Sequence, residues 1–279
     1  MGVYQLKRIA IIGHGFVGKA VDYGFTNDRV EKVIIDPIYN TTVEKNLGDP
    51  NNYHFIFVCV PTPFGEDGTI DATIFNKVMK HLTKSMLINT IIVIKSTVTP
   101  DIIQDWDVGG VVYNPEFLTE GFAKADFVRP KFHIIGGDVD ECWALKDLYE
   151  NYSLCDPAPF HFMSMSEASL VKYGINAFLA TKITFFNQLY DAAQDIGANY
   201  STIMKAIAAD PRIGSSHTKV PGFDGKQGYG GACFPKDTNA LINYSDRFTL
   251  VEECVRINNE YRAQYDLDER ERQQNVNYG

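Results

Sequence analysis

The segment Gly228-Tyr-Gly-Gly-Ala-Cys-Phe-Pro-Lys-Asp237 combines residue types that could carry out covalent catalysis. Its thiol, Cys233, follows a run of glycines, which allow a backbone to approach a ligand closely and to adopt positive φ. Lys236 supplies a nearby cation, which favours the nucleophilic thiolate. Asp237 lies four residues after the thiol, one helical turn away, where a carboxylate could handle water or protons. The alternative interpretation is a tight turn with a buried cysteine before a helix.

A second group of residues has the spacing of a dinucleotide-binding site. The apolar run 8–12 predicts a strand buried on both faces, and Gly13-His-Gly-Phe-Val-Gly18 follows it directly. The glycines permit a tight turn and close approach of a pyrophosphate to the following helix. Asp36 ends the next apolar run, where its carboxylate would accept from ribose hydroxyls and repel a 2′-phosphate, so NAD is favoured over NADP. The expected cofactor contacts in this group are Gly13, Gly15, Phe16, Val17, Gly18 and Asp36.

Strand–helix units repeat over residues 1–163 and predict an α/β domain, a doubly wound Rossmann-like parallel sheet. Further strands are expected at 33–35, 55–60, 90–94, 110–113, 133–135 and 159–162, and helices at 19–25, 72–86, 100–106 and 139–149. Ligands bind beyond the carboxyl ends of the strands in such sheets. The residues that follow two of these strands are therefore expected to line the cofactor cleft, with ordinary turn chemistry as the alternative. They are Pro61, Thr62, Ser96 and Thr97.

The pattern changes to helices alone after residue 163. Helices are expected at 167–196, 201–209, 238–243 and 249–264, with Ser164 or Ser166 as a cap of the first. They predict an all-helical domain over 164–265, followed by a polar tail, 266–279, that frays. Lys172 and Asn176 lie four residues apart on the first of these helices, so both side chains project from one face. A solvated helix face is the alternative for this pair.

Composition excludes several classes of protein. The 279 residues are 45% hydrophobic and carry a formal net charge of −9, which disfavours nucleic acid and anionic membranes as partners. The five cysteines form no CxxC pair, which argues against a disulfide framework or a metal site and favours a reducing cytoplasm. No apolar stretch reaches about 18 residues, so no transmembrane helix is expected.

Six motifs taken together resemble the UDP-glucose/GDP-mannose dehydrogenase family, and the resemblance runs from about residue 8 to residue 259. The motifs are Gly13–Gly18, Val58-Cys-Val-Pro-Thr-Pro63, Ser96-Thr97, Asn114–Gly121, Lys172 with Asn176, and Gly228–Asp237. The Gly-Ala-Cys-Phe-Pro-Lys-Asp form and the Asp-Pro-Arg-Ile-Gly form at 210–214 look most like the UDP-glucose branch.

The resemblance implies oxidation of the primary alcohol of UDP-glucose to a carboxylate with two NAD, through a thiohemiacetal and a thioester on Cys233. Lys172 and Asp237, with a water, would take the hydroxyl proton. Glu116 would position water for hydrolysis, and Asn176 would help to hold the oxyanion. The implied cofactor contacts also include Thr97, Glu120 and Lys236. The implied substrate contacts are Glu116, Phe117, Leu118, Lys172, Asn176, Arg212, Phe223, Tyr229, Gly230 and Cys233.

The resemblance also implies a homodimer built on the helical domain, with Arg212 reaching the substrate of the neighbouring subunit. Family members normally carry a third, nucleotide-binding-like domain that completes the site, and this chain stops soon after the resemblance ends. Lys219, Phe223, Lys226 and Tyr229 are then the residues expected to hold the nucleotide. Three alternatives remain: a GDP-mannose-type dehydrogenase, a truncated NAD-binding remnant or half-enzyme that needs a partner domain, and a β-hydroxyacid dehydrogenase, which needs no cysteine.

Overall fold

The computed structural model describes residues 5–65, 67–84, 87–119 and 121–278. Its contacts divide the chain into two compact units. Unit 1 comprises Met1–Thr62 and Asp71–Lys172, and unit 2 comprises Pro63–Ile70 and Tyr173–Gly279. The division falls inside the long helix α6 (Met165–Asp195) rather than at residue 163. The first turns of that helix contact unit 1, since Ser169 donates to the carbonyl of Val98 and a Cβ on Gly136 would lie 2.7 Å from Met165.

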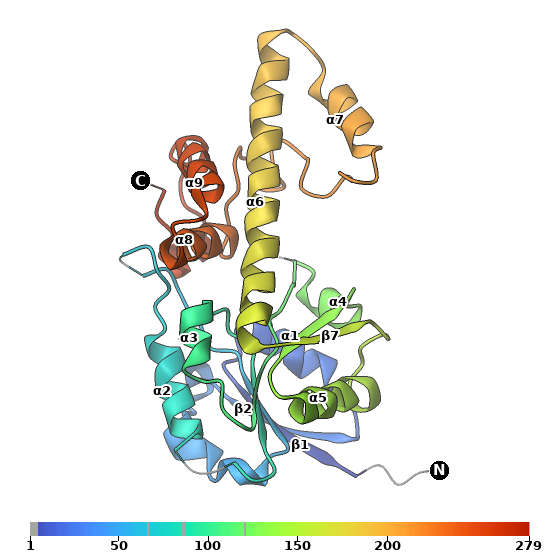
Figure 1. Cartoon of the computed structure of the whole chain (residues 1–279), viewed down its shortest axis with the longest axis vertical. Coiled ribbons are helices and arrows are strands. Elements are labelled where there is room, and N and C mark those ends of the chain that lie inside the picture. Colours follow the sequence, from blue (N-terminus) through green and yellow to red (C-terminus); the bar gives the residue numbers. More distant parts are fainter. Residues whose placement is uncertain (1–4, 66, 85–86, 120, 279) are drawn as a thin grey trace. The chain divides into compact units, whose positions relative to one another are not determined.

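Unit 1 is built on a seven-stranded sheet with the order β2-β1-β3-β4-β5-β6-β7 (Figure 1). The strands are β1 (Lys7–Ile12), β2 (Val30–Ile35), β3 (Phe55–Val58), β4 (Ile91–Ile94), β5 (Val111–Tyr113), β6 (His133–Gly136) and β7 (Phe160–Met163). Neighbouring strands pair in parallel, except β5 and β6, which are antiparallel at Tyr113 and Gly136. The central strands are short buried apolar runs, as expected where helices cover both faces. The predicted α/β fold class is confirmed.

Helices lie on both sides of this sheet (Figure 1). They are α1 (Phe16–Gly24), α2 (Thr73–Leu82), α3 (Pro100–Gln104), α4 (Ala123–Val128) and α5 (Val139–Tyr152), with short turns η1 (Pro37–Tyr39), η2 (Val43–Leu47) and η3 (Pro50–Asn52). The sequence pattern missed α4, whose six residues are too few to show a helical period. Phe127 of α4 lies so close to α1 that a Cβ on Gly24 would stand 2.0 Å from its ring. Gly24 is therefore the point at which the two helices approach.

The core on one side of the sheet is aromatic. Phe25, at the end of α1, packs its ring 5.3 Å from Phe57 of β3 and 5.6 Å from Tyr149 of α5, measured between centroids. Phe127 completes the group at 6.2 Å from Phe25. Such aromatic groups bury a large apolar area, and they hold α1 and the turn before it against the sheet.

The regular structure of unit 2 is helical over residues 173–278, as expected, and its segment Pro63–Ile70 holds an isolated antiparallel bridge between Phe64 and Ile70. Unit 2 contains the rest of α6, α7 (Tyr200–Ala208), α8 (Phe234–Tyr244), α9 (Thr249–Arg262) and α10 (Glu269–Gln273), and α7 packs beside α6 (Figure 1). Ser164 caps α6: its Oγ accepts from the N–H of Glu167 at 3.3 Å, while Glu167 Oε2 accepts from the N–H of Ser164 at 2.8 Å. This reciprocal arrangement is a capping box, and it explains where the long helix begins.

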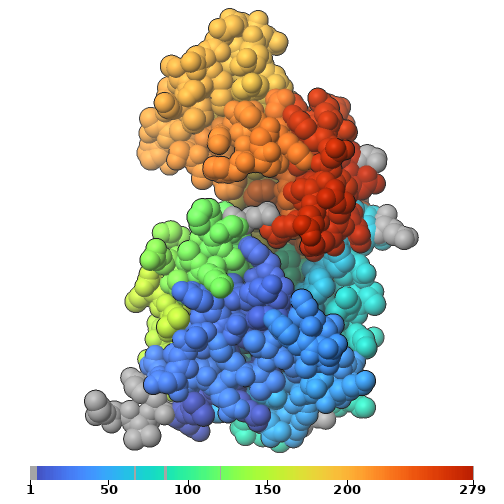
Figure 2. Space-filling model, turned by 180° about the vertical axis from the view of Figure 1, so that it is seen from behind, coloured from blue at the N-terminus to red at the C-terminus, as the bar shows by residue number. Residues whose placement is uncertain are grey.

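The expectation that the polar tail frays is wrong for residues 266–278. This segment contains α10, whose capping box pairs Asp268 with Glu271 through two hydrogen bonds of 2.8 Å. Glu271 is 0% exposed and Tyr278 is buried, and the C-terminal residues (red) lie against the rest of the helical unit in Figure 2. The charged composition misled the prediction because partners distant in sequence neutralise and bury these groups. Among the residues described, no helix is both long and apolar enough to cross a membrane.

Candidate active site

The dinucleotide turn of unit 1 is held by close backbone contacts that only glycine permits. Gly13 has φ +88°, and a Cβ there would lie 2.6 Å from the carbonyl oxygen of Cys59. A Cβ on Gly18 would lie 1.9 Å from the carbonyl oxygen of Gly13. These two glycines therefore fix the turn between β1 and α1 against the neighbouring strand, as the fingerprint requires.

The remaining parts of the fingerprint surround this turn. Gly15 is exposed and is the N-cap of α1, which has no side-chain cap, so the helix end suits a phosphate. Asp36 is fixed beside the turn, since its Oδ2 accepts from the N–H of His14 at 2.6 Å and its Oδ1 from the N–H of Ile38 at 2.9 Å. Phe16 and Val17 are half-buried in the first turn of α1. The residues present fit NAD at this end of the sheet.

We expect the substitution Gly15→Ala to weaken NAD binding without harming the fold. No atom lies within 4 Å of a Cβ built on Gly15, whereas a Cβ on Gly18 would collide with Gly13. The added methyl would instead occupy the space of the pyrophosphate, and we expect the Kd for NAD to rise roughly tenfold, about 1.4 kcal/mol. Calorimetric titration with NAD and thermal unfolding measure the two effects. Gly18→Ala is the contrasting variant, for which Tm should also fall, and an unchanged Kd for Gly15→Ala would contradict the assignment.

The loops after β3 and β4 are tied together by hydroxyl groups. Thr62 Oγ1 donates to the carbonyl of Thr97 at 2.8 Å, and Ser96 Oγ donates to the carbonyl of Val60 at 2.7 Å. These hydroxyl protons are engaged by backbone, which is the turn chemistry considered as an alternative. Pro61 is exposed and Thr97 is half-buried at this edge. Glu120, expected near the nicotinamide, lies outside the described residues.

Beneath these loops lies a buried cation that the sequence pattern did not single out. Lys95 Nζ donates to Oδ1 of Asn114 at 2.9 Å, and the phenol of Tyr149 donates to the same oxygen at 2.7 Å. Asn114 Nδ2 in turn donates to the carbonyl of Ile134 at 2.7 Å. The network links β4, β5, β6 and α5, and so it fixes the strand end that carries Glu116. The sequence did contain a signal for this buried lysine, because Lys95 directly follows a fully apolar predicted strand.

Burial lowers the pKa of Lys95 from 10.5 to about 8, although the neighbouring Cys59 and Glu116 oppose the shift. Below pH 8 both folded and unfolded chains hold the proton, and the cost of burying the charge is about 3 kcal/mol. Between pH 8 and 10.5 the unfolded chain binds more protons, so stability rises with pH. We therefore expect the free energy of unfolding of the wild type, minus that of Lys95→Met, to increase across this window. Urea titrations measure it, Lys77→Met on the surface is the control, and a difference independent of pH would contradict the argument.

Glu116 and Lys172 form a buried pair within unit 1. Lys172 Nζ donates to the carbonyl oxygen of Glu116 at 2.6 Å and lies 3.4 Å from its carboxylate Oε1. Glu116 Oε2 accepts from the N–H of Leu118 at 2.5 Å, and the ammonium lies 5.2 Å from the ring centre of Phe117. Lys172 is therefore not on a solvated helix face, which was the alternative interpretation.

Cys233, Asn176, Lys236 and Asp237 come together in unit 2. Cys233 is half-buried and is the N-cap of α8, and its carbonyl accepts from the N–H of Asp237 at 2.8 Å. Thiol and carboxylate are thus one helical turn apart, as the spacing predicted. The carboxylate of Asp237 is buried between two donors, Lys236 Nζ at 2.5 Å and Asn176 Nδ2 at 2.6 Å. The cation expected beside the thiol is therefore an ion partner of Asp237.

The glycines before Cys233 serve packing. Gly228 and Gly231 have positive φ, +75° and +77°. A Cβ on Gly228 would lie 2.7 Å from Asn258 Oδ1, and a Cβ on Gly230 would lie 2.3 Å from Arg262 Nη2. The sequence predicted that these glycines allow close approach of a ligand. The contacts show that Gly228 and Gly230 allow close packing of this loop against α9.

The remaining expected substrate residues differ in exposure. Tyr229 is buried, with its ring 6.2 Å from Phe234 and its phenol 3.4 Å from the hydroxyl of Thr238. Phe223 is 96% exposed beneath the ammonium of Lys219, 4.7 Å from its ring centre. The guanidinium of Arg212, with a side chain that is 88% exposed, pairs with Asp210 at 2.6 Å.

Two family models match the chain. Residues 39–153 match the UDP-glucose/GDP-mannose dehydrogenase family, NAD binding domain, and residues 166–260 match the central domain of the same family. UDP-glucose 6-dehydrogenase YwqF of Bacillus subtilis is 34% identical over 245 residues, 81% of this chain and 52% of that protein. UDP-glucose 6-dehydrogenase of Rhizobium meliloti is 36% identical over 220 residues, 73% of this chain and 49% of that protein. The chain thus spans about half the length of these relatives.

Solved structures agree with this match. UDP-glucose dehydrogenase from Pyrobaculum islandicum has a TM-score of 0.76 at 26% identity, covering 93% of this chain and 69% of that one. The 3-hydroxyisobutyrate dehydrogenase of Mycobacterium tuberculosis shares the fold alone, with a TM-score of 0.70 at 14% identity over 95% of this chain and 97% of that one. The fold is therefore common to both dehydrogenase types, while the sequence matches favour one. The chain belongs to the UDP-glucose/GDP-mannose dehydrogenase family, and it carries the family's NAD-binding and central domains.

Proposed function

We propose that this chain oxidises UDP-glucose to UDP-glucuronate with two NAD, through a covalent intermediate on Cys233. The observation that carries the proposal is the half-buried thiol at the N-terminus of α8, one turn before a carboxylate held by Lys236 and Asn176. The first turn of a helix favours a thiolate, because its N–H groups carry partial positive charge. The buried pair of Glu116 and Lys172 is the second element.

The reaction balances as one primary alcohol, two NAD⁺ and one water giving one carboxylate, two NADH and three protons. Bound NAD supplies the hydride acceptor for both oxidations. Asp237 and Lys172, through a water, remove the hydroxyl proton in the first oxidation. The sulfur of Cys233 then bonds to the aldehyde carbon, and the oxygen takes a proton to give a thiohemiacetal, which loses hydride and proton to become a thioester. Tethering prevents escape of the aldehyde before the second oxidation.

Glu116 orients the water that hydrolyses the thioester and returns the thiol. Glu116 and Lys172 lie in unit 1, and Asn176, Cys233 and Asp237 lie in unit 2. Family membership supports the proposed roles of both groups of residues. UDP-glucose is favoured because the curated relatives described above are UDP-glucose 6-dehydrogenases.

We propose further that the chain acts as a homodimer through the helical unit. Phe178 and Phe185 are 68% and 57% exposed on α6, two turns apart on one face, which is unusual for large apolar side chains. In this proposal the exposed guanidinium of Arg212, which pairs with Asp210 at 2.6 Å, reaches the second copy that covers this face. Light scattering after size-exclusion chromatography tests the dimer, with Phe178→Glu as the disrupting variant.

The decisive experiment is NADH release with a panel of UDP- and GDP-sugars. Two NADH for each UDP-glucose, with UDP-glucuronate identified by mass spectrometry, is the expected result. Two NADH from a GDP-sugar, with none from UDP-sugars, would show that the substrate is of the GDP-mannose type. One NADH for each sugar would show that the second oxidation does not occur and that no thioester forms. Absence of NADH with every sugar, in a protein that binds NAD, would favour a binding remnant or a chain that needs a partner domain.

A further inference from the structure

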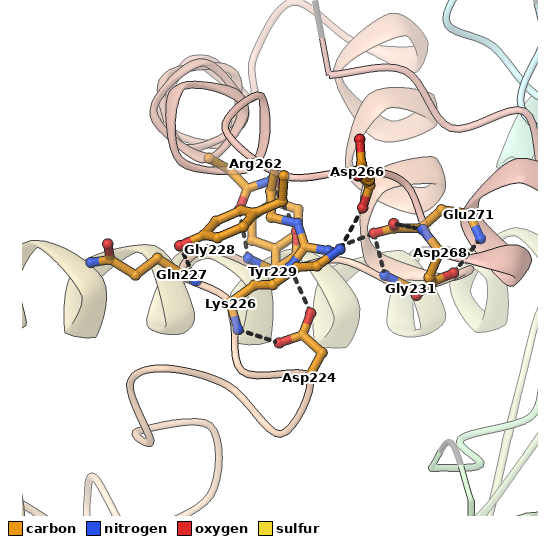
Figure 3. A network of polar contacts seen from close by, with 12 residues as sticks. Asp224, Lys226, Gln227, Gly228, Tyr229, Gly231, Arg262, Asp266, Asp268 and Glu271 are labelled. Carbon is orange, nitrogen blue, oxygen red and sulfur yellow. Dashed lines mark hydrogen bonds and ion pairs between the residues drawn. The ribbon is translucent and has the colours of Figure 1, made fainter.

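The C-terminal segment, residues 266–278, packs against the loop that leads to Cys233 and is hydrogen-bonded to it. The carboxylate of Glu271 points toward Gly231 of this loop (Figure 3), and the residue is fully buried. Its Oε1 accepts three hydrogen bonds: from the N–H of Gly231 at 3.1 Å, from Nη2 of Arg262 at 2.7 Å and from the phenol of Tyr278 at 2.7 Å. A buried charge with this many donors is fixed in place, because any displacement leaves a buried polar group unsatisfied.

Arg262, from the last turn of α9, is the second half of this support. It is 1% exposed, and its Nη1 donates to Asp224 Oδ2 at 2.7 Å in addition to the bond with Glu271 (Figure 3). A Cβ on Gly230 would lie 2.3 Å from Arg262 Nη2 and 2.5 Å from Glu271 Oε1. The loop therefore rests directly on the ion pair of Arg262 and Glu271, with no room for a side chain between them.

Asn258, one turn before Arg262, fixes the preceding residue of the loop. Its Oδ1 accepts from the N–H of Tyr229 at 2.6 Å and its Nδ2 donates to the carbonyl of Tyr229 at 3.1 Å. The C-terminal segment also holds a second loop of unit 2, because the carbonyl of Gln274 accepts from the N–H of Phe64 at 3.1 Å. Phe64 lies two residues after Thr62, an expected cofactor contact.

We propose that Glu271 is a positioning residue for Cys233. Through the N–H of Gly231 it fixes the backbone two residues before the thiol, and so it sets the direction in which Cys233 leaves the loop at the start of α8. The negative charge matters because the buried guanidinium of Arg262 needs a counter-charge at this point. This inference rests on the proposed role of Cys233, but it makes a prediction about the thiol that does not depend on turnover.

The test compares Glu271→Ala with Glu271→Gln and Tyr278→Phe in the whole chain. Tyr278→Phe is the matched control, since it removes one hydrogen bond to Oε1 but leaves the bond to Gly231. The first measurement is the rate of alkylation of Cys233 by iodoacetamide, followed by peptide mass spectrometry, with Cys155 of unit 1 as the internal reference. The second is hydrogen exchange of the peptide that contains Gly231. The third is kcat and KM for NADH formation.

We expect Glu271→Ala to change the alkylation rate at Cys233 by roughly tenfold, to speed exchange at Gly231 and to lower kcat by a similar factor while KM for NAD stays constant. Glu271→Gln should recover part of each effect, and Tyr278→Phe should show little. A folded Glu271→Ala protein with unchanged alkylation and exchange would overturn the inference. If Glu271→Ala does not fold, unchanged values for folded Glu271→Gln overturn it instead. Altered alkylation in a chain that forms no NADH even as wild type would leave the inference standing and remove the proposed function.

Discussion

Replacing Cys233 by serine is expected to lower formation of the sugar acid by at least roughly 1,000-fold, because removal of a catalytic nucleophile typically costs this much or more. A serine hydroxyl at the same position keeps the size of the side chain but is a far weaker nucleophile without a base to activate it. The measurement is the initial rate of NADH formation with UDP-glucose, together with the amount of UDP-glucuronate. The Kd for NAD should stay within about twofold, since the glycine turn that fits NAD lies in unit 1.

Cys155→Ser is the matched control for this experiment. Cys155 is also half-buried, but it lies in unit 1, where its Sγ is 3.1 Å from the carbonyl of Phe127. Its replacement should leave the rate of NADH formation within about twofold. Normal acid formation by Cys233→Ser would remove Cys233 from the mechanism. An equal loss of activity in both variants would point to damage to the fold rather than to a missing nucleophile.

Replacing Lys172 by methionine is expected to harm both stability and turnover. The ammonium is the buried ion partner of Glu116, 3.4 Å from its carboxylate, and removal of one member of a buried pair costs about 3–5 kcal/mol. Urea titration should show this loss in the free energy of unfolding. Turnover should fall roughly 100-fold or more, because the proposed alkoxide then loses its cation.

A second substitution separates the two effects of Lys172. In Lys172→Met combined with Glu116→Gln, the buried carboxylate is neutralised, so most of the stability should return. Glu116→Gln alone is the reference for turnover, because Glu116 has its own proposed catalytic role, and the double variant should turn over far more slowly than this reference. Lys182→Met is the control on the same helix, since its Nζ donates to the carbonyl of Ile213 near the surface. Recovery of turnover together with stability in the double variant would show that the lysine is structural alone.

The same group of charges shows where sequence reasoning succeeded and where it failed. The strands around Gly13–Gly18 followed from apolar runs, and the four-residue spacing of Cys233 and Asp237 correctly placed both on one helix turn. The pairing of Lys172 with Glu116 joins residues 56 positions apart, and no local pattern encodes it. The ion pair of Lys236 with Asp237, at 2.5 Å, was also not anticipated, since the sequence pattern drew attention to the lysine only as a cation near the thiol.

The sequence by itself determined the order of the strands and of all the described helices except α4 and α10, the glycine turn that suits NAD and the family to which the chain belongs. These features depend on periodicity, on turn chemistry and on motifs a few residues long, so they can be read from neighbours along the chain. The tertiary structure alone decided that Lys95 is a buried cation, that Gly230 packs against Arg262, and that Glu271 is fully buried. From sequence alone, a charged residue is expected to be exposed to solvent. Only the fold brings distant hydrogen-bond partners to it, and these partners offset the free-energy cost of burying the charge.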